Sequence, residues 1–115
     1  MIDKTQTTKP TQIEAVYVRE MAKFYKVLGD ETRLRILYAL SQREMCVTDL
    51  VDALEMSQSS VSHQLRILRD NGQVRTRRDG RNIFYSLDDK HVLDIFQEAL
   101  QHISHRMAEG KIPRN

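Results

Sequence analysis

The hydrophobic pattern of this chain changes its period in the middle of the sequence, and this change constrains the fold more than any other feature. Before residue 74, apolar residues recur every three or four positions, which predicts amphipathic helices. From Val74 to Leu87 the pattern alternates on both sides of Asp79-Gly80, and an Asp-Gly pair between two alternating runs predicts a β-hairpin. Helical spacing then returns. The sequence therefore predicts a mainly α protein with one small hairpin.

Helix start and stop signals divide the rest of the chain into five helices. Gly29 ends the first helix, Asp30 can cap the second, and Gly72 ends the fourth. The predicted helices cover about residues 12–28, 30–41, 48–54, 57–71 and 88–106. The order is thus α-α-α-α-β-β-α. Two helices joined by a short turn precede a two-stranded ribbon, which is the arrangement of a winged helix-turn-helix.

At 115 residues the chain is short enough to form one domain. We expect a flexible N-terminal arm over residues 1–11, the winged helix-turn-helix domain over 12–106 and a polar C-terminal tail over 107–115. No apolar run is long enough to span a membrane, and the polar N-terminus lacks the apolar segment of a secretory signal. A single cysteine cannot form an internal disulfide, so we expect a cytoplasmic protein with no membrane partner.

Positive charge is concentrated in residues 57–84. This segment carries six arginines against two aspartates, a net charge of +4, whereas the whole chain carries +2. Arginine suits phosphate groups and guanine edges because its planar guanidinium donates hydrogen bonds in pairs. The cluster therefore indicates a nucleic-acid surface, and the winged helix-turn-helix makes double-stranded DNA the expected partner. A solvated basic face is the alternative.

The predicted helix 57–71 has one apolar side and one polar side. Val61, Leu65 and Leu68 form the apolar stripe, which leaves the opposite side for DNA. The candidate DNA-binding residues on this helix and around the hairpin turn are Gln58, Ser59, Ser62, His63, Arg66, Arg77, Arg78 and Arg81. The helix can contact phosphates and base edges, and the hairpin can contact flanking backbone or the minor groove. The alternatives are an ordinary solvated helix face and arginines that only keep a hairpin soluble.

Three of the four histidines lie in the last predicted helix, together with Asp89. His102 and His105 share a face, and His91 lies on nearly the same side three turns earlier. Eleven residues of helix span about 16 Å, so one helix cannot bring all four side chains to one ion, whose ligands lie about 2 Å away. If two copies of the helix pack antiparallel, the start of one meets the end of the other, and two sites form. Surface histidines on an amphipathic helix are the alternative.

Four segments carry a family resemblance. Residues 28–37 (LGDETRLRIL), 46–50 (CVTDL), 57–65 (SQSSVSHQL) and 80–87 (GRNIFYSL) resemble motifs of the ArsR/SmtB family of metal-sensing transcriptional repressors. The resemblance covers about residues 15–106. It implies a homodimer in which the fourth helix reads DNA and the first and last helices form the interface. It also implies the inter-subunit site of the family's zinc sensors, formed by Asp89 and His91 of one chain with His102 and His105 of the partner.

The donor types predict which metal such a site binds. Three nitrogens and one oxygen in a closed tetrahedron favour Zn²⁺, with Co²⁺ as a close mimic and Ni²⁺ less favoured. Family members that sense thiophilic ions commonly have Cys-Val-Cys-Asp-Leu, where this chain has Thr48 in place of the second cysteine. One thiolate with Asp49 makes a poor arsenic or cadmium site. We therefore expect Cys46 to be a small buried residue, with a vestigial metal or redox role for Cys46 and Asp49 as the alternative.

Together these features predict a repressor that binds operator DNA as an apo dimer and is released by Zn²⁺ or Co²⁺. Release would start transcription of metal efflux or homeostasis genes, as the resemblance implies. The alternatives are a thiol-responsive or metal-independent DNA-binding regulator that uses Cys46, and a dimerisation protein without DNA, which the arginine cluster disfavours. An enzyme is not expected, because four protein ligands close the zinc shell and the chain has neither a Gly-rich phosphate loop nor an activated nucleophile. No organic cofactor is expected either.

Overall fold

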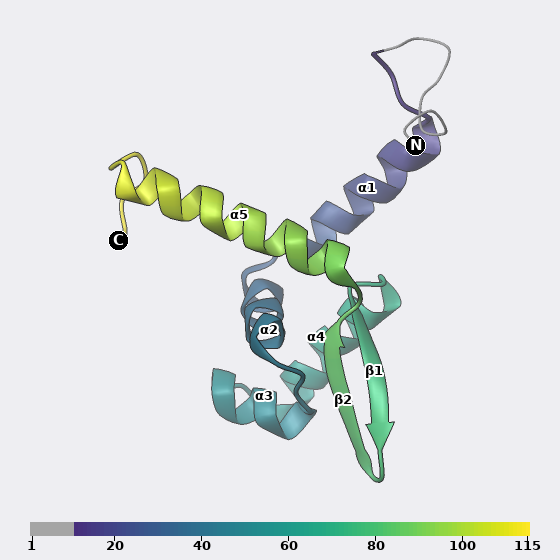
Figure 1. Ribbon diagram of the computed structural model, residues 1–115. Helices are drawn as coiled ribbons and strands as arrows, with labels where there is room; N and C mark the ends of the chain where they lie inside the picture. The colour runs from purple at the N-terminus through teal and green to yellow at the C-terminus, as the bar shows by residue number, and fades with distance from the viewer. Residues whose placement is uncertain (1–10) are drawn as a thin grey trace.

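The computed structural model describes residues 11–115, which form five helices and one antiparallel hairpin (Figure 1). The elements are α1 (Ala15–Leu28), α2 (Glu31–Gln42), α3 (Val47–Leu54), α4 (Gln58–Asp70), β1 (Val74–Asp79), β2 (Asn82–Leu87) and α5 (Lys90–Ala108). The predicted order is therefore confirmed. Of the predicted arm, residues 1–10 lie outside the described residues. Within residues 11–115, no helix has the length and apolar character needed to cross a membrane.

The core lies between α2, α3, α4 and the hairpin. Its most deeply buried apolar side chains are Ile36, Leu37, Leu50, Val61, Leu65 and Leu68. Three of these form the predicted apolar stripe of α4, so the orientation of that helix is confirmed. Its polar side faces solvent because the stripe is fixed against α2 and α3.

Helix ends follow the capping signals with three differences, one of which is that α5 ends at Ala108, two residues beyond its predicted end. Asp30 caps α2 by accepting a hydrogen bond from the Arg33 N–H at 3.0 Å, and Ser57 caps α4 through the Ser60 N–H at 3.1 Å. The first helix begins at Ala15, three residues later than predicted. The third begins at Val47, one residue earlier, because Cys46 occupies the N-cap position.

The hairpin has the predicted strands, but its turn is shifted by one residue. Asp79 pairs with Asn82, so the two turn residues are Gly80 and Arg81 rather than Asp79 and Gly80. Gly80 has φ +65°, the conformation that the first position of a type II′ turn requires. A short bridge from Met45, just before α3, extends the hairpin, with two backbone hydrogen bonds of 3.0 and 2.7 Å to Tyr85.

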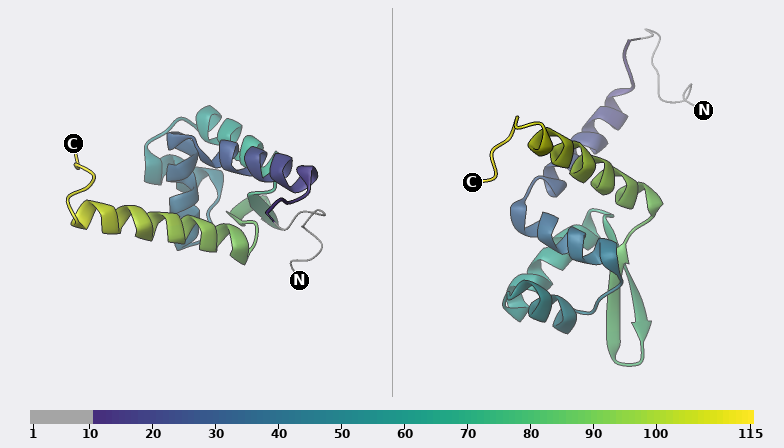
Figure 2. Two further views of the ribbon diagram at one scale, coloured as in Figure 1. Left: turned by 90° about the horizontal axis from the view of Figure 1, so that it is seen from above. Right: turned by 60° about the vertical axis from the view of Figure 1, so that its left-hand side comes forward.

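The two terminal helices are much less covered than the core helices. The outer half of α1 and the C-terminal half of α5 project away from the body of the molecule (Figures 1 and 2). No residue of α1 is buried, and Val92 is the one buried residue of α5. The large apolar side chains that remain exposed on them include Val16, Tyr17, Val18, Met21, Tyr25, Leu100 and Ile103. Both helices therefore present apolar surface that a single chain leaves open.

Candidate nucleic-acid interface and metal ligands

The candidate reading face of α4 is fully open to solvent. Ser59, Ser62, His63 and Arg66 are exposed on the side away from the buried stripe, and Gln58 is exposed at the first residue of the helix. Because Ser57 caps the helix, its N-terminus begins at a fixed point, where free N–H groups and the helix dipole favour a phosphate. The structure thus brings the predicted α4 residues together on one surface.

Arg33 connects this helix to the end of α1. Its Nε donates to the Val27 carbonyl at 2.7 Å, and its Nη1 donates to the Gln64 Oε1 at 3.2 Å. A cation beside the last carbonyls of α1 also suits the negative end of the helix dipole. Sequence reasoning missed this role, because nothing in the spacing places Arg33 near Gln64, which is 31 residues away.

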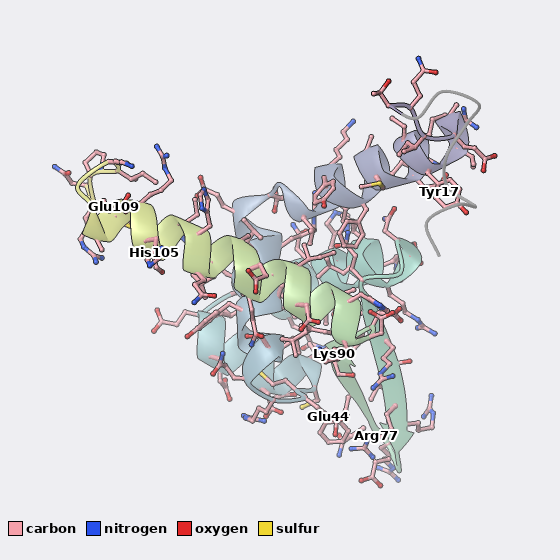
Figure 3. All side chains as sticks on the ribbon, turned by 45° about the horizontal axis from the view of Figure 1, so that its top comes forward. Tyr17, Glu44, Arg77, Lys90, His105 and Glu109 are labelled. Carbon is pink, nitrogen blue, oxygen red and sulfur yellow. The ribbon has the colours of Figure 1, made fainter. Side chains whose placement is uncertain are left out.

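The three candidate arginines of the hairpin fall into two groups. Arg77 lies beside Glu44 near the hairpin (Figure 3), and Glu44 accepts hydrogen bonds from its Nη2 and Nε at 2.6 and 3.1 Å. The guanidinium also lies 5.0 Å from the centre of the Phe84 ring. The hydrogen bond from Arg77 holds the pKa of Glu44 below its ordinary value. Arg78 and Arg81 are exposed, and no ion pair is recorded for them within residues 11–115. Arg77 thus holds the hairpin through Glu44, whereas Arg78 and Arg81 remain candidates for DNA contacts.

Asp89 and His91 form a prearranged pair at the start of α5. Asp89 is the N-cap: its Oδ1 accepts from the N–H groups of His91 and Val92 at 2.9 and 3.2 Å. Its Oδ2 lies 3.4 Å from the His91 Nδ1, and the two side chains are 51% and 89% exposed. These hydrogen bonds, led by that from Val92, lower the pKa of Asp89. The carboxylate is therefore ionised, oriented and accessible.

The other two candidate ligands lie at the opposite end of the same helix. His102 and His105 are exposed, and Figure 3 shows His105 far along α5 from Lys90, which follows Asp89. Within the part of the chain that the structure describes, no group of three or more metal-binding side chains comes together. One chain thus holds two separate pairs of donors. Carboxylate and imidazole are both good zinc ligands, so each pair fits half of a zinc site.

Cys46 and Asp49 have a structural role at the start of α3. The Cys46 N–H donates to the Asp49 Oδ2 at 3.2 Å, which closes a capping box and lowers the pKa of Asp49. Arg43 lies 3.6 Å from the same carboxylate. Cys46 is half-buried, so the expectation that it is buried is only partly met, because the N-cap position lies at the edge of the core.

Comparisons with known proteins agree with this architecture. The profile of bacterial regulatory proteins of the arsR family matches residues 30–76. A transcriptional repressor SmtB homolog of Synechocystis is 41% identical over 102 residues, which cover 89% of this chain and 77% of that protein. The solution structure of apo-NmtR has a TM-score of 0.72 at 39% identity, covering 87% of this chain and 84% of that one. A homodimeric winged helix-turn-helix DNA-binding domain from Mycobacterium bovis has a TM-score of 0.75 at 26% identity, covering 93% and 100%.

Proposed function

Because this chain belongs to the ArsR/SmtB family of winged-helix transcriptional repressors, we propose that it binds operator DNA as an apo homodimer and is released by Zn²⁺. Its relatives are transcriptional regulators and not enzymes. Co²⁺ is the close alternative ion. Release then starts transcription of a metal efflux or homeostasis gene.

The exposed polar face of α4 supports the DNA half of this proposal. In a dimer, the two reading helices enter successive major grooves, about 34 Å apart on a two-fold operator. Gln58, Ser59, Ser62, His63 and Arg66 then contact phosphates and base edges, while Arg78 and Arg81 contact the flanking backbone. Arg77 acts through its ion pair with Glu44, which holds the hairpin against the segment before α3.

The arrangement of donors on α5 is the observation that carries the zinc half. Asp89 and His91 lie within 3.4 Å of each other at one end, and His102 and His105 share a face at the other. The apolar side chains Leu100 and Ile103 are exposed on the same helix, so α5 offers both a surface for a second copy and two complementary half-sites. Antiparallel packing of two such helices completes two sites with three imidazoles and one carboxylate each.

Zinc acts on DNA binding through the shape of the dimer. An ion held by both chains favours a dimer in which the distance between the two α4 helices no longer matches the distance between the two halves of the operator. DNA must then weaken zinc affinity by the same factor, because coupling between two ligands is reciprocal. A coupling of about 3 kcal/mol corresponds to about 150-fold.

Fluorescence anisotropy on the upstream DNA of the gene itself tests the proposal, at fixed salt because phosphate contacts depend on salt. Three proteins are compared with zinc or chelator: the wild type, a His102→Gln/His105→Gln variant and a Gln101→Ala/Ser104→Ala control on the same helix. We expect zinc to weaken DNA binding by more than about tenfold for the wild type and the control. The double histidine variant should stay bound.

If zinc changes the DNA affinity of none of the three proteins, the histidines are surface residues and the proposal fails. A thiol-responsive regulator then becomes the better hypothesis. It predicts that an oxidant weakens DNA binding of the wild type but not of a Cys46→Ser variant.

A further inference from the structure

Gln73 is the one polar residue that is completely buried among residues 11–115, at 0% exposure. It lies in the turn between α4 and β1, and its Nε2 donates to the Phe24 carbonyl near the end of α1 at 2.9 Å. Only the amide nitrogen can donate, so this partner fixes which way the amide faces. Burial of an amide among apolar side chains is unfavourable. A residue of this type at this position therefore needs an explanation beyond packing.

The main chain of Gln73 connects two further elements. Its N–H donates to the Leu68 carbonyl in the last turns of α4 at 2.9 Å, and its carbonyl accepts from the Asp88 N–H at 3.0 Å. Asp88 directly precedes Asp89, the cap of α5. One residue thus joins α4, the end of α1 and the segment just before α5.

The other amide atom of Gln73 has no partner. Its Oε1 is buried and accepts no hydrogen bond. A buried acceptor without a donor raises the free energy of the arrangement that contains it. The free-energy cost of this arrangement would be removed if a movement of the surrounding elements gave Oε1 a donor.

We propose that Gln73 is the positioning residue that sets the orientation of α4 relative to α1 and α5, and hence the distance between the two reading helices of the dimer. The dimer and the response to zinc in this inference rest on the proposed function above. Arg33 provides a separate connection between α1 and α4, so loss of the Gln73 amide loosens the orientation without detaching the helix.

A set of two-fold DNA sites whose half-site separation changes by single base pairs tests this proposal without any metal. Gln73→Met keeps the length of the side chain and removes both the donor and the unpartnered acceptor. The matched control is Gln42→Met, at the exposed end of α2. We expect the wild type and the control to prefer one separation sharply. The Gln73 variant should bind that site about tenfold more weakly and discriminate less among separations.

A merely structural role predicts lower stability instead, so urea unfolding of the dimer is measured in parallel. We expect an unfolding midpoint close to that of the wild type, because the variant loses the hydrogen bond to the Phe24 carbonyl but also no longer buries an unpartnered acceptor. A Gln73→Met dimer with the wild-type separation preference overturns the proposal. Zinc added to the same assay separates the two hypotheses: if it does not weaken the wild type, the proposed function fails, while the separation preference still decides the role of Gln73.

A measurement on the wild type keeps the test valid if the variant does not fold. Side-chain amide resonances of Gln73 in ¹⁵N-labelled apo dimer should exchange slowly with water, since the amide is buried and hydrogen-bonded. They should shift on addition of operator DNA. Fast exchange, or a resonance that DNA leaves unchanged, contradicts the proposal.

Discussion

The two halves of this molecule differ in how far one chain completes them. The α3, α4 and hairpin region has buried apolar stripes, capped helices and a hairpin held by the Glu44–Arg77 ion pair and the Met45–Tyr85 bridge. The α1 and α5 region has apolar side chains in solvent and four candidate metal ligands divided between two ends of one helix. The comparison teaches that the DNA-reading region is complete within one chain, whereas the metal-responsive region proposed above would be completed only by a second copy.

The strongest test of this difference is a charge on the open face of α5. Ile103→Glu should weaken the dimer at least about 100-fold, because each two-fold interface would bury two unpaired carboxylates. Sedimentation across a concentration series measures this. Gln101→Glu, with the same charge on another side of the helix, is the control. The fold of each chain should persist by circular dichroism, and a stable Ile103→Glu dimer would show that α5 is not the interface.

The DNA-reading region can be tested by a substitution that weakens DNA binding and leaves the dimer intact. Arg66→Met should lower operator affinity by about tenfold or more, because one exposed guanidinium on the reading face is lost. Zinc affinity should be unchanged. Arg69→Met, in the last turn of the same helix, provides the comparison at equal charge. If both variants lost the same operator affinity, α4 would contribute to DNA binding through its net charge and not through the side chains of one particular face.

Two substitutions of Asp89 can separate its role as the N-cap of α5 from its proposed role as a zinc ligand. Asp89→Ser keeps a side-chain oxygen that can cap α5 but removes the carboxylate, so zinc affinity should fall about tenfold with little change in thermal unfolding. Asp89→Ala should lose the cap as well and lower the unfolding temperature. Calorimetry and thermal melts of both variants measure these two effects. Zinc binding of wild-type strength by Asp89→Ser would exclude the carboxylate from the site.

The smallest effect is expected at the hairpin. Glu44→Gln should lower DNA affinity only about two- to threefold, because an exposed ion pair contributes little. The pKa of Glu44 lies below its ordinary value of 4.5 through the Arg77 hydrogen bond. The stabilisation by this pair is therefore fully present above pH 4.5 and lost as the pH falls through the lower pKa of the folded protein. An NMR titration of the Glu44 carboxyl should show its midpoint rising in Arg77→Gln. An unchanged midpoint would contradict the pairing.

Sequence reasoning succeeded where the interactions are local or periodic. Helix order, the apolar stripe of α4 and the cap at Asp30 follow from spacing and from side chains that bond within three residues. The turn at Gly80 was misplaced by one residue, because strand register depends on pairing along the whole hairpin. The distant partners of Arg33, Arg77 and Gln73 left no local signal, since contacts between residues 31 to 49 positions apart arise only from the packed fold.

The hydrogen bonds of Asp89 have a consequence for how selective a metal site at this position can be. Two backbone N–H groups already restrict the rotamer of this carboxylate, so an ion that binds it costs little further conformational entropy. The side chain of His91 is 89% exposed and is held only by its 3.4 Å contact with Asp89. An arriving ion therefore meets one fixed oxygen and imidazoles that must be ordered around it. Ions with different preferred bond lengths are then distinguished by how well the histidines adjust to a donor that does not move.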